Sequence, residues 1–517
     1  MAPSNALALA KNEEESNSLL SPSPSQQPFP PLNGLLKSLH LNKEESKVAL
    51  SRFQRFLQFE TVSATAPTTG AYKECARFLY QELKSSSSCW DSIIYLPEAP
   101  DHSPVLIAHW KGSRPELPVI VLNSHYDVVP ATEKDGWTVP PFQGIRKDGK
   151  IYGRGSQDMK CVCLQYMEAV RKLRSIHPKY QPLRSIYLTF VPDEEIGGSG
   201  MACLLDSTWY KSLPGIALAL DEGLASTSNI FDVFYGERLP WWVSVEAEGP
   251  TGHGSRFIEP TAVGQLLEFT QKALQFRNSQ RDQLEMHSHE NCTHAVLKKR
   301  EQQQMKKKTK KKTLGDVTTL NITTLKAGVR VGNTYAFNCV PPKAECSLDI
   351  RISPHMQPVE MKNLLDRWCR ECSQPNTTNA DPSGLSWRFI GGQGCGGMTH
   401  ALTDTDVKIN PWYGVFQTAM SDLGLEISPQ VFPAATDSRF LRALGIRALG
   451  FSPMRNTEIL LHENDEYIPE STYLEGIAIY VHLIQTLGSA DDVSTNKKRQ
   501  SEASIVETQD DKKQKGA

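Results

Sequence analysis

The sequence predicts an α/β protein, in which a mostly parallel sheet flanked by helices is interrupted by a smaller α+β domain. Residues 117–123 and 185–191 are nearly continuous apolar runs, which are typical of central strands covered on both faces. Residues 161–173 carry apolar side chains at helical spacing, and strands that alternate with helices indicate a parallel sheet. From residue 241 the pattern changes to strands of alternating polarity, which indicates a second domain.

The larger domain is predicted in two parts, residues 46–239 and 401–488. The first part is expected to contain helices from residue 47 and at residues 73–83 and 161–173, and strands at residues 93–96, 105–110, 117–123, 185–191 and 216–220. The second part is expected to contain a helix at residues 412–423, a strand, and a long helix at residues 473–487. The chain would therefore leave this domain and return to it.

The inserted domain is predicted at residues 240–400, and it includes a basic low-complexity insertion at 281–313. Within that insertion, residues 298–312 carry nine Lys or Arg against a single acid. A nuclear-localisation signal or a patch for a polyanion is one interpretation of this run. A solvated, disordered insertion in a loop is the interpretation that we favour. The polar segments 1–45 and 489–517 are predicted to be disordered tails.

Composition excludes two functional classes. Fifty-six Lys and Arg balance 58 Asp and Glu, so a protein that mainly neutralises nucleic-acid phosphates is not expected. No apolar run approaches the roughly 18–20 residues that span a bilayer, so no membrane association is expected. The eleven cysteines are scattered along the chain, and the first residues fit neither a secretory signal nor a transit peptide. We therefore expect a cytoplasmic protein.

The informative residues are acids and histidines that follow the predicted strands, where sites in open α/β sheets assemble. His125 follows the run 117–123, and Asp127 stands where it could accept a hydrogen bond from the second ring nitrogen. Asp158 stands at the entrance of the helix at 161–173, so it could also serve only as a helix cap. Each of these motifs is a weak signal by itself.

Two further strands end in the same way. Glu194 and Glu195 follow the run 185–191, and adjacent carboxylates at a buried strand end are costly to keep ionised unless one binds a cation. A solvated acidic turn is the alternative. Glu222 follows the strand at 216–220, and His462 lies near the end of the chain.

Together these separated segments offer one mixed set of nitrogen and oxygen ligands. The candidate metal ligands are His125, Asp158, Glu195, Glu222 and His462. Two Zn²⁺ per chain, bridged by one carboxylate, would account for the set and leave open positions for water, as a catalytic site requires.

The same segments resemble a known family. The strings SHYDVVPA, IYGRGSQDMK, TFVPDEEIGG, ALDEG, PAATDSRF and LLHENDE are similar to those of the co-catalytic zinc amidohydrolases and exopeptidases. That family includes aminoacylases, acetylornithine deacetylases and glutamate-releasing carboxypeptidases, and the aminoacylases are the most similar. The resemblance extends from about residue 45 to residue 487, apart from the basic insertion. It implies a catalytic domain in two parts and an inserted dimerisation or lid domain.

The resemblance implies a role for each matching residue. The five candidate ligands match the zinc ligands, with Asp158 bridging the two ions. Glu194 matches the general base that takes a proton from the attacking water and returns it to the leaving amine, and Asp127 matches the residue that orients His125. His253 matches a histidine that reaches the active site of the other subunit of a homodimer and stabilises the oxyanion.

The resemblance also implies a substrate and a reaction. Asn338 and Arg351 match residues that hold the carbonyl and the carboxylate of the substrate. The expected reaction is hydrolysis of N-acyl-L-amino acids to a free amino acid and a carboxylate. A dipeptidase or a carboxypeptidase on the same scaffold is the alternative within the family. A catalytically inactive scaffold or a nucleic-acid binder is the alternative outside it, and the basic run has no interleaved aromatic residues that could stack on bases.

Overall fold

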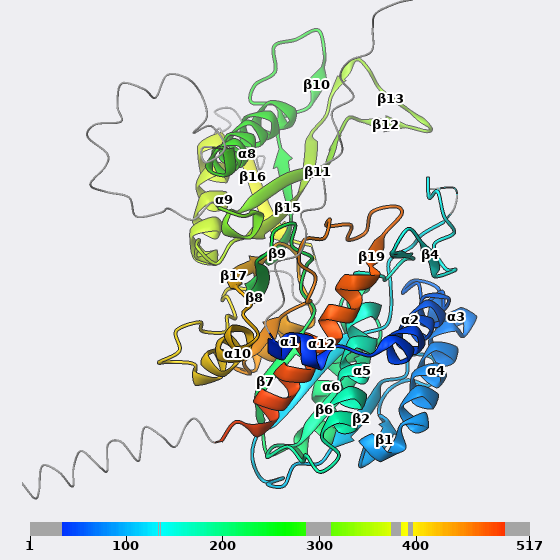
Figure 1. Cartoon of the computed structure of the whole chain (residues 1–517). Coiled ribbons are helices and arrows are strands. Elements are labelled where there is room, and N and C mark those ends of the chain that lie inside the picture. The colour runs from blue at the N-terminus through cyan, green and yellow to red at the C-terminus, as the bar shows by residue number, and fades with distance from the viewer. Residues whose placement is uncertain are drawn as a thin grey trace, which may run out of the picture.

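The computed structural model describes residues 34–132, 134, 136–285, 312–373, 384–390 and 397–491. These residues form two lobes, a larger one around an eight-stranded sheet and a smaller one around a four-stranded sheet (Figure 1). Within the described ranges, none of the helices combines the length and the apolar character that crossing a membrane requires.

The helices come in the order α1 (Gly34–Leu39), α2 (Lys43–Leu57), α3 (Ala66–Thr69), α4 (Ala71–Ser85), η1 (Ser87–Cys89), α5 (Lys160–Ile176), η3 (Glu194–Ile196), α6 (Ser199–Asp206), α7 (Thr208–Lys211), α8 (Ala262–Glu285), η5 (Leu314–Asp316), α9 (Pro358–Cys372), α10 (Pro411–Asp422), α11 (Ser438–Ala443) and α12 (Glu470–Ser489), where η marks a 3₁₀ turn. The strands are β1 (Ser92–Tyr95), β2 (Leu106–Trp110), β3 (Val119–His125), β4 (Ile145–Lys147), β5 (Lys150–Tyr152), β6 (Ile186–Val191), β7 (Ile216–Asp221), β8 (Phe231–Glu237), β9 (Leu239–Glu248), β10 (Gly252–His253), β11 (Thr319–Ala327), β12 (Arg330–Val331), β13 (Thr334–Tyr335), β14 (Cys339–Val340), β15 (Lys343–Ile352), β16 (Gly384–Phe389), β17 (Ile427–Phe432), β18 (Ala448–Gly450) and β19 (Tyr467–Pro469).

The large sheet has the strand order β1-β2-β6-β3-β7-β18-β8-β17. The central strands β6, β3, β7 and β18 are parallel to their neighbours within this group. β2 runs against β6, while β8 and β17 are parallel to each other but run against β18. A mostly parallel sheet flanked by helices is therefore confirmed. The strand direction reverses between β18 and β8.

Strand β3 shows why the sheet is covered on both faces. Ile120 and Leu122 pack in the core that includes α5 and α12, whereas Val119 and Val121 pack in a second core with α6 and α11. Because neighbouring side chains of a strand point to opposite faces, a central strand between two helical layers is apolar at nearly every position.

The smaller lobe contains the antiparallel sheet β11-β15-β9-β16, with α8 and α9 packed against it (Figure 1). Trp241, Val243 and Val245 alternate along β9 and are buried in the core of this lobe. β8 leads into β9 through Arg238 alone, so the chain enters the smaller lobe directly from the large sheet.

Two predicted boundaries are wrong, the end of the N-terminal disordered tail and the start of the basic insertion. Residues 34–45 belong to α1 and the start of α2, and Leu36 and Leu39 are buried against a core that includes α12. The start of the predicted basic insertion, at 281–285, is the last part of α8. Residues 286–311 of the insertion, with nearly all of the basic run, lie outside the described residues, as do 1–33 and 492–517.

Candidate metal centre

The candidate ligands come together because three parallel strands end at one edge of the large sheet. β3 ends at His125, and its neighbours β6 and β7 end at Val191 and Asp221. Since these strands are parallel and adjacent, the residues that follow them meet at the same edge. The turn after β6 carries Glu195, and Glu222 comes directly after β7.

Two carboxylates face the outer ring nitrogen of His125. Its Nε2 lies 3.1 Å from Oδ1 of Asp158 and 3.2 Å from Oε2 of Glu222. All three side chains are buried, with exposed fractions of 1%, 7% and 6%. This half of the site therefore offers one imidazole nitrogen and two carboxylates that are shielded from water.

A second half contains His462. Its Nε2 lies 3.2 Å from Oδ2 of Asp158 and 3.1 Å from Oε2 of Glu195. Asp158 thus points one carboxylate oxygen at each imidazole. The structure brings all five candidate ligands together, and Asp158 is the residue that both halves share.

The alternative role of Asp158 as a helix cap is wrong. Helix α5 begins at Lys160, and its N-cap residue is Met159, which makes no side-chain cap hydrogen bond. The side chain of Asp158 instead points to the two histidines.

Asp127 links His125 to the turn that follows β6. Nδ1 of His125 lies 3.1 Å from the backbone carbonyl oxygen of Asp127 and 3.4 Å from its Oδ1. The Asp127 carboxylate accepts hydrogen bonds from the backbone N–H groups of Glu194 and Glu195, each at 3.2 Å, and from the Ser63 hydroxyl at 2.8 Å. Asp127 therefore fixes the position of the acidic turn as well as that of the ring.

The acidic groups of the site lack enough positive charge around them, and a cation would supply it. Burial and the nearby Asp158 raise the pKa of Glu195 to about 7 and the pKa of Glu222 well above its usual range. Burial and Glu222 likewise raise the pKa of Glu194. The pKa of His462 rises to about 10 beside Asp158 and Glu195. These groups retain protons because too little other positive charge is near, and divalent cations would replace the protons.

The donor atoms also suit metal ions by their spacing. Ligand atoms of His125, Asp158 and Glu195 lie within 4.8 Å of one another, and so do those of His125, Glu194 and Glu222. Imidazole nitrogens and carboxylate oxygens are the ligands of catalytic zinc sites. The residues present therefore fit a metal centre.

Glu194 lies on η3 beside the ligands, and one of its neighbours, Arg439, is not predictable from the sequence. The side chain of Glu194 is 8% exposed, and its Oε1 lies 3.6 Å from Nη1 of Arg439. Arg439 stands in the string PAATDSRF, but the sequence alone gives no sign that this string approaches the turn after β6. Asp437 of the same string is fully buried.

Three site residues are predicted in the smaller lobe: His253, Asn338 and Arg351. The first two lie together, and Arg351 does not. β10 pairs with β14, so His253 is opposite Cys339, and the carbonyl of the adjacent Asn338 accepts a hydrogen bond from the Gly254 N–H at 2.7 Å. His253 and Asn338 are exposed, and β10 lies at the end of the lobe far from the large sheet (Figure 1).

Arg351 lies at the other end of β15. It is opposite Pro240, where β9 begins, while the first residue of β15, Lys343, is opposite Glu248. Its Nε donates to Oδ1 of Asp349 at 2.7 Å. Arg351 is therefore separated from Asn338 by most of the length of β15.

Comparison with a family model and with curated proteins gives the same family. The sequence model of peptidase family M20/M25/M40 matches residues 121–486. Aminoacylase-1 of Dictyostelium discoideum is 38% identical over 452 residues, which cover 86% of this chain and 99% of that protein. Human aminoacylase-1 is 36% identical over 452 residues, which cover 86% of this chain and 97% of that protein.

Solved structures show the same fold. Human carnosine dipeptidase 1 is similar with a TM-score of 0.58 at 16% identity, over 88% of this chain and 98% of that chain. The dipeptidase Dug1p of Saccharomyces cerevisiae is similar with a TM-score of 0.56 at 17% identity, over 88% of this chain and 99% of that chain. With the buried cluster of histidines and carboxylates, these similarities place the chain in peptidase family M20/M25/M40, as a metal-dependent hydrolase of amide or peptide bonds.

Proposed function

We propose that this protein hydrolyses N-acyl-L-amino acids to a free L-amino acid and a carboxylate, with two Zn²⁺ per subunit and with Glu194 as general acid and base. The observation that carries the proposal is the buried centre in which Asp158 lies between His125 and His462, with Glu194 beside it. The aminoacylase-1 relatives, at 36% to 39% identity, support the choice of substrate.

The proposed ligands divide into two sets that share Asp158: His125 with Glu222, and His462 with Glu195. Zinc bound there would lower the pKa of a coordinated water and polarise the substrate carbonyl. Asp127 holds the His125 ring in place, because Nδ1 carries the proton when Nε2 is a ligand.

Glu194 is placed to move the proton. With cations in place of the retained protons, its carboxylate can take a proton from the attacking water and pass it to the nitrogen of the leaving amine. Its backbone N–H donates to Asp127, which fixes the turn, and Arg439 lies 3.6 Å from one of its oxygens. The carboxylate is thus held by both its backbone and a neighbouring guanidinium.

We also propose a homodimer in which His253 donates to the oxyanion in the active site of the partner subunit. The exposure of His253 and the place of β10 at the far end of the smaller lobe support this proposal (Figure 1). Asn338, beside His253, is proposed to hold the substrate carbonyl, and Arg351 its carboxylate. A guanidinium has five N–H donors, so Arg351 can bind a carboxylate while it contacts Asp349.

A further proposal concerns the compartment in which the enzyme works. We propose that it works in the cytoplasm, because the described cysteines are free thiols, as expected in a reducing compartment. No nucleic acid or membrane is proposed as a partner.

The substrate proposal predicts a preference for a blocked amino group. N-acetyl-L-methionine should give a kcat/KM at least about tenfold higher than an unblocked dipeptide that ends in methionine. The two substrates share the free carboxylate, so Arg351 can bind either, and they differ at the acyl side of the amide. Steady-state kinetics on both substrates test this. A higher kcat/KM on the dipeptide would instead favour the dipeptidase alternative.

Metal removal should abolish activity and destabilise the fold. We expect about two zinc ions per chain in the purified protein, complete loss of turnover on dialysis against a chelator, and recovery when zinc is added. Ligand binding at a thousand times Kd stabilises a protein by about 4 kcal/mol, so the melting temperature should fall as well. Elemental analysis and thermal denaturation measure the two effects. Full activity in metal-free protein would contradict the proposal.

A further inference from the structure

We propose that the buried ion pair between Arg154 and Glu466 positions the metal centre, by fixing the segment that carries Asp158 against the segment that carries His462. The affinity of the site for metal then depends on a pair that supplies no ligand. This inference rests on the metal centre proposed above, and it assigns a positioning role to two residues outside the ligand set.

Glu466 holds the loop that leads to Asp158. Its Oε2 accepts from Nη1 of Arg154 at 2.7 Å and from the Gly155 N–H at 3.1 Å. Its Oε1 accepts from the Gln157 N–H at 2.6 Å and from the Asp158 N–H at 3.4 Å. Glu466 is fully buried, so these contacts are not shared with solvent. One carboxylate thus binds most of the turn between β5 and α5.

Arg154 extends the same contacts to His462. Its Nη2 donates to the backbone carbonyl of His462 at 3.2 Å, and its guanidinium lies 5.1 Å from the centre of the Trp137 ring. His462 is in an irregular segment between β18 and β19, with a positive φ of 63° and a side chain 46% exposed. The ligand on this loop therefore depends on neighbouring residues for its position.

Gln157 ties the two segments together next to the ion pair. Its Nε2 donates to the carbonyls of Glu458 and Tyr467, and its Oε1 accepts from the Leu460 N–H at 3.0 Å. The strands on either side also pair, with Tyr152 of β5 opposite Tyr467 of β19. The contacts of Arg154, Gln157 and Glu466 all join two segments that each carry a candidate ligand.

Stability alone does not explain an ion pair at this place. Desolvation makes buried ion pairs poor stabilisers, and apolar pairs of similar volume often stabilise a fold as well or better. Residues that orient metal ligands, in contrast, commonly change metal affinity by about 10- to 100-fold when they are replaced. The contacts to the backbones of Asp158 and His462 are of this second kind.

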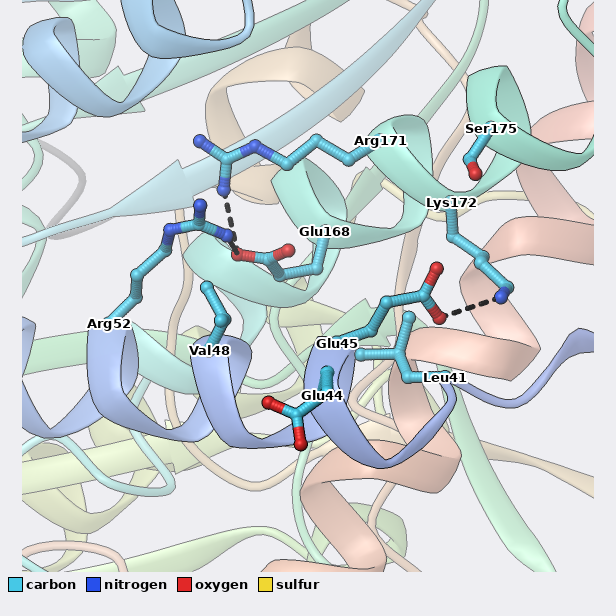
Figure 2. A pocket seen from close by; sticks show the side chains of 9 residues that line it. All are labelled: Leu41, Glu44, Glu45, Val48, Arg52, Glu168, Arg171, Lys172 and Ser175. Atoms are coloured by element: carbon cyan, nitrogen blue, oxygen red, sulfur yellow. Dashed lines mark hydrogen bonds and ion pairs between the residues drawn. The ribbon is translucent and has the colours of Figure 1, made fainter.

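Glu168 provides a matched control. It accepts from Nη1 of Arg52 at 2.9 Å and from Nη1 of Arg171 at 2.7 Å, and its side chain is 6% exposed (Figure 2). It lines a cavity between α2 and α5, ten residues after Asp158 on the chain, which is about 15 Å along a helix. Glu168→Gln makes the same chemical change in a buried Arg–Glu contact away from the metal centre.

The experiment measures zinc affinity by competition with a chromophoric chelator, and the absorption spectrum of the Co²⁺-substituted protein, for wild type, Glu466→Gln and Glu168→Gln. We expect Glu466→Gln to weaken zinc binding at least about tenfold and to change the Co²⁺ spectrum. Glu168→Gln should keep both, even if its melting temperature falls. Wild-type affinity and spectrum in Glu466→Gln would overturn the inference.

The double variant R154M/E466M covers the case in which Glu466→Gln does not fold. It replaces both charged side chains by apolar ones of similar volume, so no unpaired buried charge is left to oppose folding, and we expect it to lose zinc affinity as well. A folded double variant with wild-type zinc affinity would overturn the inference. If wild type itself binds no zinc, the proposed function fails; if wild type binds zinc and hydrolyses N-acetyl-methionine, only the positioning role is in question.

Discussion

Replacing Glu194 by glutamine is expected to abolish turnover and to leave metal binding intact. The amide keeps the size of the side chain but cannot accept the proton of the attacking water, and loss of a general acid and base commonly costs about two to four orders of magnitude in rate. The larger value is expected here, because Glu194 would act twice, first as base and then as acid. The backbone hydrogen bond from residue 194 to Asp127 survives the change, so the turn should keep its place.

The measurement is kcat on N-acetyl-L-methionine together with zinc content. Glu168→Gln is again the matched control, since it removes a buried carboxylate charge that has no contact with the proposed ligands. If Glu194→Gln is fully active, Glu194 is not the general base. If it is inactive but has also lost zinc, Glu194 supports the metal site and its role in proton transfer is not supported.

The parts of the site that follow regular strands could be predicted from the sequence. His125 ends β3, Glu195 lies in the turn after β6, and Glu222 directly follows β7, and these three parallel neighbouring strands bring their ends together. The apolar runs identify the strands, and the residues after them could be identified by position alone. Local pattern and one topological rule were sufficient there.

The parts that depend on contacts between distant segments could not be predicted in this way. Glu466 meets Arg154 because β19 pairs with β5, more than 300 residues away in sequence, and no local pattern signals that pairing. Arg439, at the start of α11, lies close to Glu194 through another contact between distant segments that no local pattern signals. Helix α1 is only six residues long, too short for a periodic signal, and Leu36 and Leu39 are buried by tertiary contacts.

Sequence spacing also gave no account of Asn338 and Arg351. They are thirteen residues apart in the chain, but β15 runs nearly the whole way between them, so an extended strand separates the two side chains. The structure places Asn338 beside His253 instead. A substrate held by all of these residues would need groups from both ends of the smaller lobe, which the proposed dimer could supply.

Mixing two inactive variants is therefore expected to restore activity. His253→Ala alone should lose about two to three orders of magnitude in rate, as expected for an oxyanion donor, and Glu194→Gln should be nearly inactive. In a mixed dimer, one active site combines an intact Glu194 with the intact His253 of the other chain. Random exchange of subunits should then restore roughly a quarter of wild-type activity, since half of the dimers are mixed and each has one working site of two.

The control and the contrary result use the same assay. The two variants are coexpressed with different tags, the mixed dimer is purified through both tags, and its kcat is compared with that of each parent. In this purified mixed dimer one site of two works, so about half of the wild-type activity is expected. A partner that carries both substitutions, E194Q/H253A, should restore nothing when it is paired with His253→Ala. If His253 acts within its own subunit, every site of the E194Q and H253A mixed dimer contains one lesion, so no activity returns. Restoration thus requires that His253 cross to the partner, as its exposed position at the far end of the smaller lobe leads us to expect.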